Sequence, residues 1–519
     1  MNTVSTTSFH SILFPFPASA AEDDDALHDL ALDQVFARIG DAAPRAASAL
    51  RAPLTTVEDV AYRQAVFQGL ETPALRSAVD PFLRAMSDVE RRDRQAAKAD
   101  VPYVGELLHL GAACTYVAAV EALHAGLAGA VPVLDPPSAG WAGLAAHVAA
   151  LVASDGFRAL ARDATSLQAD IDALRYNALV RGGKVTIAPV DGERDLGEAV
   201  LETFARFRTR AAAAHRAEPQ EPAMDHVQAW MLERVARVHP DAFARLTSFA
   251  RGSRAYRDPT LDRFVDEVRF YLAYLDYLAP LSRAGLPVSY PAVSATDKLL
   301  DVRDTWDLAL APSLVERSVP VVTNDLTLSG AERILVVSGP NQGGKTTTAR
   351  TFGQLHHLAA IGCPVPGRDA RIFLCDRVLT VFGREETLGT LEGRLGAEVH
   401  RLHDVLGRAT DRSVVVINEA FASTALHDAR ILTRDVLERL SARDTLAACV
   451  TFIDELSRLN EKTVSMVSAV DPADPAVRTF RVTRRVADGR AYARALAVKH
   501  GLTSEQIAAH VAAEGREAS

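Results

Sequence analysis

The sequence predicts a multidomain protein in which an all-α domain is followed by an α/β domain. Three observations predict this class. The chain has 519 residues, which at about 150 residues per domain is too long for one ordinary domain. Between residues 26 and 290, apolar residues recur at three- and four-residue spacings, as in amphipathic helices. Beyond residue 291, short apolar runs alternate with helical patterns, as in a largely parallel sheet covered by helices.

The composition is that of a globular protein without a strong charge bias. Hydrophobic residues make up 48% of the chain and charged residues 24%, and the formal net charge of −9 excludes a polycation. Any nucleic-acid binding therefore depends on a local basic face. No Lys or Arg precedes the apolar stretch from Phe9 to Ala21, and no apolar run approaches the length of a membrane span, so we expect a cytoplasmic protein with no membrane partner.

The first 290 residues divide into a tail and a helical domain. We expect an N-terminal tail over residues 1–25 and the helical domain over residues 26–290. The clearest helical patterns run from Glu106 to Leu123, over 225–238 and over 262–281. One stretch, 177–194, interrupts them with two β-like segments around a Gly-Gly pair, which predicts a small hairpin.

The α/β domain is expected over residues 291–490. Three apolar runs, 333–338, 413–417 and 446–451, are typical of buried strands, and 347–361 has the pattern of a helix. The segment 491–519 looks like two short helices broken near Gly501, with Thr503 as the cap of the second. We expect this tail to be a separate helix-turn-helix element.

A glycine-rich segment carries the strongest chemical signal. It follows a predicted strand, opens a predicted helix and matches the pattern GxxxxGK[ST] in full, with the residues Gly339, Pro340, Asn341, Gln342, Gly343, Gly344, Lys345, Thr346 and, one position on, Thr347. Backbone N–H groups of such a loop cradle phosphates, the lysine neutralises the β- and γ-phosphate oxygens, and the Thr346 hydroxyl is available to Mg²⁺. The sequence therefore predicts a site for ATP with Mg²⁺.

A second motif lies at the end of the predicted strand 413–417. Asn418 and Glu419 follow this strand directly. An Asp normally holds the Mg²⁺ shell at the first position, whereas Asn418 offers only a neutral amide oxygen. Glu419 is the candidate general base and, with Lys345, one of two candidate catalytic residues.

Taken together, these motifs resemble those of the MutS family of DNA mismatch-repair ATPases, which have an ABC-type P-loop domain. The segment 338–347 resembles the family's TGPNMGGKST, and Asn324-Asp325 resembles its upstream FxPND element. Three further segments resemble IDRIFTRVG, DEIGRGTS and ATHYxEL in the family's order, namely 375–383, 418–424 and 451–456. The tail 491–519 is similar to the helix-turn-helix that dimerises the family's ATPase domain. The helical domain is similar to the family's core and lever domains.

The departures from the family change what the resemblance implies. Nothing before the helical domain resembles the mismatch-recognition and connector domains, so we expect a short MutS-related protein without them. Phe452 stands at the position of the family's switch histidine, and Asn418 at that of its Mg²⁺ aspartate. The signature that contacts the partner's nucleotide is reduced to 392–399, which leaves Arg394 and Glu398 as candidate trans contacts.

The resemblance implies an ATP-binding homodimer that binds DNA by its structure or backbone, moves its helical arms when ATP binds, and hydrolyses ATP slowly. The Arg- and aromatic-rich stretch 249–257 is a candidate DNA contact, although a solvated helix face is the favoured interpretation. The alternative function is that of a nucleotide-switched interaction protein, in which ATP-dependent dimerisation engages a protein partner.

Overall fold

The computed structural model describes residues 9–13, 24–42, 48–181, 184–190, 226–383, 394–422, 424–471 and 477–487. Its contacts divide the chain into two compact units. Unit 1 comprises residues 1–9, 72–134 and 141–262, and unit 2 comprises residues 10–71, 135–140 and 263–519. The chain is helical in its first half and α/β in its second half, as predicted, and segments of the helical half lie within unit 2.

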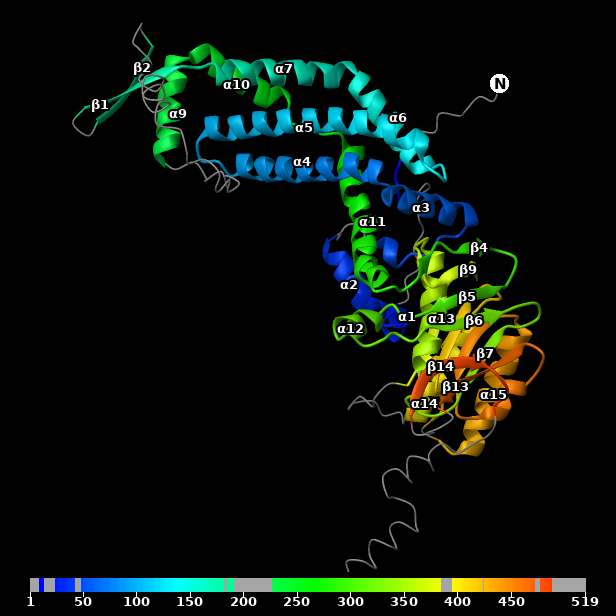
Figure 1. The fold of residues 1–519 in the computed structure, drawn as a ribbon. Helices are drawn as coiled ribbons and strands as arrows, with labels where there is room; N and C mark the ends of the chain where they lie inside the picture. The colour runs from blue at the N-terminus through cyan, green and yellow to red at the C-terminus, as the bar shows by residue number, and fades with distance from the viewer. Residues whose placement is uncertain are drawn as a thin grey trace, which may run out of the picture. The chain divides into compact units, whose positions relative to one another are not determined.

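Unit 1 is built mainly from long helices (Figure 1). The helices α4 (Pro73–Ala97) and α5 (Pro102–Ala130) run side by side, and α7 (Asp155–Asp172) and α10 (Pro240–Gly252) pack on α5. Three of these helices start with a proline, which fits the first turn because that turn needs no N–H from it. The remaining helices that include residues of this unit are η2 (Val131–Val133), α6 (Ala139–Ala153), α9 (His226–Val238) and the start of α11 (Pro259–Arg283).

The predicted hairpin is present in unit 1. Strand β1 (Tyr176–Arg181) pairs antiparallel with β2 (Lys184–Pro189) over their whole length. The last residues of the predicted hairpin segment, 191–194, lie outside the described part of the chain.

The expectation that no apolar run could span a membrane is wrong for one helix. By length and composition, the helical stretch Pro102–Val133 meets the requirements of a membrane span. Its Ala- and Gly-rich sequence has another use in the structure, because small side chains allow α4, α7 and α10 to pack closely around it. For example, Gly126 lies so close to Ala78 of α4 that a Cβ atom on the glycine would be 2.5 Å from the Ala78 Cβ.

Three α-helices of unit 2 precede the helices of unit 1 in sequence. These are α1 (Asp24–Asp29), α2 (Leu32–Ala42) and α3 (Val57–Leu70). Thr56 caps α3 by accepting a hydrogen bond of 3.1 Å from the N–H of Asp59. The short helix α12 (Ala311–Glu316) and most of α11 also belong to this unit.

The main sheet of unit 2 has six strands in the order β10-β11-β12-β7-β13-β14. They are β7 (Ile334–Ser338), β10 (Val378–Phe382), β11 (Val414–Asn418), β12 (Leu446–Val450), β13 (Thr463–Val470) and β14 (Arg478–Arg484). The first five are parallel and β14 is antiparallel to β13. All residues of β7 and β12 are buried, which explains their uninterrupted apolar sequences.

Helices cover both faces of this sheet. On one face, Gly353 of α13 (Lys345–Ala360) lies against Val416. On the other, Val415 and Ile417 form a core cluster with α14 (Arg394–Arg408), α15 (Leu426–Ala442) and η3 (Asp454–Arg458). Successive strand residues point to opposite faces, so β11 contacts both layers. Its carboxyl end and that of β7 lie at the same edge of the sheet.

A second sheet, of four strands, lies in the same unit in the order β4-β9-β5-β6. Its strands are β4 (Ala292–Ser294), β5 (Leu300–Thr305), β6 (Asn324–Leu328) and β9 (Arg368–Phe373). A two-stranded pair, β3 (Val288–Ser289) and β8 (Val365–Pro366), completes the unit. The predicted dimerisation tail, 491–519, lies outside the described residues.

Candidate functional site

The glycine-rich loop 339–344 connects the buried strand β7 to the helix α13. Gly344 directly precedes the first residue of α13. Its φ is +93°, a backbone conformation that residues with a side chain disfavour. Gly343 lies against β13, where a Cβ atom would be 2.1 Å from Oγ of Ser468. That hydroxyl donates a hydrogen bond of 2.5 Å to the carbonyl of Gly343. The loop is thus shaped by its own glycines and by the neighbouring strand.

Lys345, the first residue of α13, directs its ammonium group into this loop. Its Nζ donates to the carbonyl of Gly339 and to Oδ1 of Asn341, each at 3.0 Å, and to the carbonyl of Pro340 at 3.4 Å. The residue is 4% exposed. Burial lowers the pKa of Lys345, and the carboxylate of Glu419 opposes that shift.

The next residue of α13 reaches the end of β11. Thr346 donates a hydrogen bond of 3.0 Å from Oγ1 to Oδ1 of Asn418, the last residue of that strand. Two oxygen atoms of the kind that Mg²⁺ prefers therefore lie together beside the loop, although both are neutral. Such a pair fits an ion that is held mainly by phosphate oxygens and water.

Glu419 follows Asn418 and completes this edge of the sheet. Its φ is +50°, an uncommon conformation for a residue other than glycine, and its N–H donates to the carbonyl of Val450 in β12 at 3.0 Å. Its side chain reaches the loop, and Oε1 lies 3.5 Å from Nζ of Lys345. The Glu419 side chain is 40% exposed and remains in contact with solvent.

The remaining candidate residues lie around this centre in different settings. Phe452 is two residues beyond the end of β12 and half exposed. Glu398 is buried, and its Oε2 accepts a hydrogen bond of 2.9 Å from the N–H of Phe421, so it holds the loop after β11 within its own chain. Arg394 is the first residue of α14, and its side chain lies outside the described part of the structure.

The antiparallel strand β14 is a contributor that the sequence analysis missed. Arg478 donates from Nε to the carbonyl of Asn341 in the loop at 3.0 Å. Asn324 of β6 bonds to β14 twice, from Nδ2 to the carbonyl of Phe480 at 3.2 Å and from the N–H of Val482 to Oδ1 at 2.7 Å. The resemblance to an FxPND element had singled out Asn324, but no pattern in the sequence indicated its partner strand.

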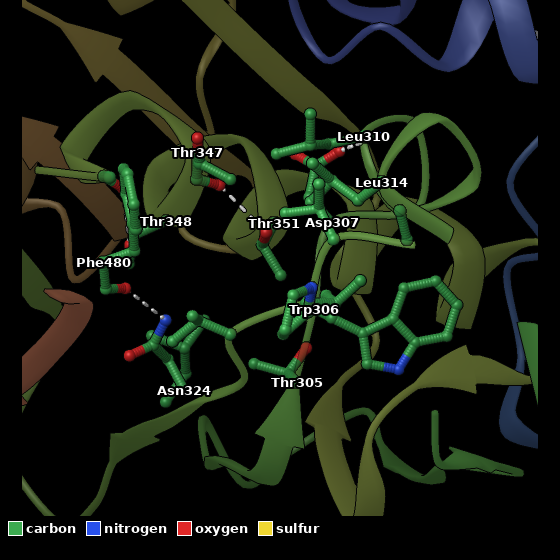
Figure 2. A pocket seen from close by; sticks show the side chains of 17 residues that line it. Thr305, Trp306, Asp307, Leu310, Leu314, Asn324, Thr347, Thr348, Thr351 and Phe480 are labelled. Carbon is green, nitrogen blue, oxygen red and sulfur yellow. Dashed lines mark hydrogen bonds between the residues drawn. The ribbon is translucent and has the colours of Figure 1, made fainter. Parts of the chain in front are cut away.

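A cavity of about 240 Å³ lies beside the start of α13 (Figure 2). Gly344, Thr347, Thr348 and Thr351 of the loop and helix form one wall. The segment 305–326, which includes Leu310 and Leu314, and Phe480 of β14 form the rest. The lining is mainly apolar, in contrast to the polar loop next to it.

Two side chains of the Arg- and aromatic-rich stretch 249–257, a candidate DNA contact, are bonded within unit 1, whereas Arg251 and Arg254 are exposed. Tyr256 donates from its hydroxyl to both carboxylate oxygens of Asp93 at 3.1 Å. Arg257 forms ion pairs with Glu90, Asp93 and Asp262. These two side chains therefore stabilise the helical unit from inside.

Comparison with known proteins gives a family for the α/β region. Residues 335–510 match the family model described as MutS domain V. The chain is 29% identical over 255 residues to an endonuclease MutS2 of Gemmatimonas aurantiaca, a match that covers 46% of this chain and 30% of that protein. It is 30% identical over 206 residues to a DNA mismatch repair protein MutS of Microcystis aeruginosa, covering 38% of this chain and 23% of that protein.

A third relative, a DNA mismatch repair protein MutS of Chloroflexus aurantiacus, is 27% identical over 235 residues, which is 45% of this chain and 23% of the relative. The chain thus spans less than a third of the length of each of these proteins. The matched segment holds the glycine-rich loop from Gly339 on, Asn418 and Glu419 together. Residues 335–510 of this chain are therefore similar to a domain of the MutS family.

Proposed function

We propose that this chain is a MutS-like protein that binds ATP with Mg²⁺ in the loop 339–344, hydrolyses it slowly, and uses it to control binding to DNA. The observation that supports this most strongly is the position of Lys345, whose ammonium group lies between the loop carbonyls and the carboxylate of Glu419. A buried cation at the start of a helix is suited to an anionic ligand with several oxygens. The loop is the expected place for the β- and γ-phosphates.

The roles of the side chains follow from their positions. Lys345 would give up its hydrogen bonds to the loop carbonyls and donate to phosphate oxygens instead. Thr346 and Asn418 would hold the ion, whose charge neutralises that of the phosphates when it is bound. Glu419, half in solvent and beside the loop, would orient and deprotonate a water molecule. Turnover would be slow because Asn418 brings no charge and because Phe452 has no polar group to contact a phosphate.

The assembly and the DNA are also part of the proposal. A homodimer in which the partner covers α14 and α15 is supported by the exposed apolar side chains of these helices, namely Leu395, Val399, Leu426 and Ile431. Two of the relatives are named as DNA mismatch repair proteins, which supports DNA as the partner. Contact with phosphates would dominate such binding, and ATP-dependent dimer closure would move the helices of unit 1. The compartment we propose is the cytoplasm.

One titration tests the proposal. The full chain is titrated with ATP and Mg²⁺, and in the same solutions with branched and mismatched duplex DNA at several salt concentrations, while phosphate release is measured. We expect ATP binding, slow turnover, and DNA affinity that depends on ATP and falls steeply with salt. Lys345→Ala should abolish detectable ATP binding, because the buried cation contributes charge-assisted hydrogen bonds. The exposed Lys98→Ala is the matched control and should bind ATP normally.

Unchanged ATP affinity in Lys345→Ala would contradict the assignment of the loop. A chain that binds ATP but no DNA at low salt would contradict the DNA claim alone. A protein partner that is retained only with ATP would then support the alternative, a nucleotide-switched interaction protein.

A further inference from the structure

The segment 11–13, which belongs to the predicted N-terminal tail, is buried in unit 2. Ser11, Ile12 and Leu13 are 4%, 0% and 2% exposed. The segment is part of no helix or strand. Since buried main-chain groups need hydrogen-bond partners, the partners of these residues show what holds the segment in place.

Side chains of two helices, α3 and α11, hold the main chain of this segment. From residue 10 to residue 13, successive carbonyls accept hydrogen bonds alternately from α11 and α3, namely from Arg263 at 2.7 Å, Tyr62 at 2.6 Å, Tyr271 at 2.6 Å and Arg63 at 2.9 Å. The segment therefore lies between the two helices. It is held through its main chain, as a peptide ligand is held in a peptide-binding site.

Glu267 of α11 makes the most selective contact with the segment. Glu267 is 8% exposed, and its carboxylate accepts hydrogen bonds from the Ser11 hydroxyl at 2.7 Å and from the N–H of Ile12 at 3.0 Å. The same hydroxyl accepts a hydrogen bond of 3.0 Å from the N–H of Leu13. Because a buried carboxylate needs such donors, this position requires a residue with a hydroxyl group. The next two residues bury aliphatic side chains.

Contacts that do not involve the segment hold the two helices together. Phe67 of α3 packs on three aromatic rings of α11, those of Phe270, Tyr271 and Tyr274, with ring centroids 5.8, 4.5 and 5.7 Å apart. Such aromatic pairs stabilise the packing of the helices beyond the area that they bury. The walls on both sides of the segment therefore keep their own contacts when the segment leaves.

We propose that α3 and α11 form a binding slot for a short peptide, and that residues 10–13 occupy it as a detachable ligand from the same chain. The slot recognises a residue with a hydroxyl group followed by two aliphatic residues. A free peptide of this pattern competes with the chain's own segment for the slot. The slot shares no residue with the loop 339–344, and its binding of peptide does not depend on ATP.

Native-state hydrogen exchange of the full chain tests this. The N–H groups of Ile12 and Leu13 are bonded in the slot and exchange when the segment detaches. A synthetic peptide of residues 5–15 is added and occupies the slot while the segment is detached. At about 1 mM peptide we expect these two N–H groups to exchange about tenfold faster, as for a dissociation constant of about 0.1 mM. Exchange in α3 and α11 should not change.

The control peptide carries Ser11→Ala and lacks the hydroxyl from which Glu267 accepts a hydrogen bond. Loss of a hydrogen bond to a charged group weakens binding by about tenfold or more, so at the same concentration exchange should rise no more than about twofold. In the full chain without peptide, Glu267→Gln should accelerate exchange of the same two N–H groups by about tenfold. Glu58→Gln, at an exposed position of α3, should not.

Three results would overturn the inference. If the peptide does not accelerate exchange at Ile12 and Leu13, the segment is not a detachable ligand. If the Ser11→Ala peptide accelerates exchange equally, Glu267 does not select the hydroxyl group. If Glu267→Gln loses protection throughout α3 and α11, the segment and the helices form one cooperative core and no separate slot exists.

Discussion

Thr346 and Asn418 are joined by a hydrogen bond of 3.0 Å from the threonine hydroxyl to the amide oxygen. The bond connects the first turn of α13 to the carboxyl end of β11, two elements that are 72 residues apart. It also fixes the positions of the two oxygen atoms that we propose would hold the ion. Because neither is charged, phosphate and water would supply most of the ion's coordination.

Asn418→Asp should raise Mg²⁺-dependent turnover. A charged acceptor contributes about 1.5 kcal/mol more than a neutral one, so we expect the Mg²⁺ concentration at half-saturation to fall by roughly tenfold. Phosphate release measured against Mg²⁺ checks this, with Asn418→Ala as the control that removes the oxygen. An unchanged Mg²⁺ dependence would indicate that Phe452, and not Asn418, limits turnover. The variant Phe452→His then tests this.

His356 and His357 should make the protein less stable in acid. Both are buried in α13, and burial lowers the pKa of each to about 4. An unfolded histidine titrates near 6.5, so between about pH 6.5 and 4 the unfolded chain binds more protons, and the free energy of unfolding falls as the pH falls. Each histidine adds up to about 1.4 kcal/mol per pH unit to this slope.

The variant that isolates one of these groups is His357→Gln. A glutamine can still donate to the carbonyl of Leu50, which His357 contacts at 2.8 Å, but it does not titrate. Urea denaturation between pH 4.5 and 7 gives the free energy of unfolding as a function of pH. The slope of that curve should correspond to one proton fewer taken up on unfolding than in the unsubstituted chain. His403→Gln, at an exposed position of α14, should not change the slope. An equal slope in both variants would show that His357 is not buried in the neutral form.

Arg63→Met should destabilise unit 2. The guanidinium is fully buried, and it donates to the carbonyls of Leu13 at 2.9 Å and Ile361 at 2.6 Å. Burial lowers its pKa, and the substitution leaves buried carbonyls without donors, at about 1–3 kcal/mol each. We expect a loss of about 3 kcal/mol in urea denaturation. Arg439→Met, at an exposed position of α15, should leave stability unchanged, and a loss in Arg63→Met below about 1 kcal/mol would contradict the structural role.

Removal of residues 492–519 should impair self-association, if this segment is the dimerisation element that its sequence suggests. Light scattering on the full and truncated chains measures this directly. A truncated chain that remains dimeric would place the interface on the described surface, for which the apolar residues of α14 and α15 are the first candidates.

The strands around the loop could be predicted because they are buried on both faces. β7, β11 and β12 and the helix α13 all occur within two residues of their predicted bounds. The bounds of these elements can be seen in the sequence itself, because uninterrupted apolar runs end at glycines and polar residues. The GxxxxGK[ST] pattern likewise singled out Lys345 and Thr346, which lie at the start of α13 beside the loop; their roles toward a nucleotide stay a prediction.

Contacts between distant segments could not be predicted in this way. Gln354 of α13 donates to the carbonyl of Leu30 and accepts from the N–H of Leu308, so one side chain joins three segments of unit 2. Neither partner has a sequence pattern that names the other. The same holds for Glu398, which was singled out as a contact to a partner's nucleotide and is found bonded to Phe421.

The contact between Ser468 and Gly343 has a consequence for the kinetics of ligand capture. Since β13 already moulds the loop, the entropy of ordering it is lost when the protein folds and not when a ligand arrives. Association should then proceed as encounter with a rigid receptor, without a slow isomerisation at the loop itself. We expect any movement that ATP causes to begin at the side chains of Glu419 and Phe452, because both are partly exposed.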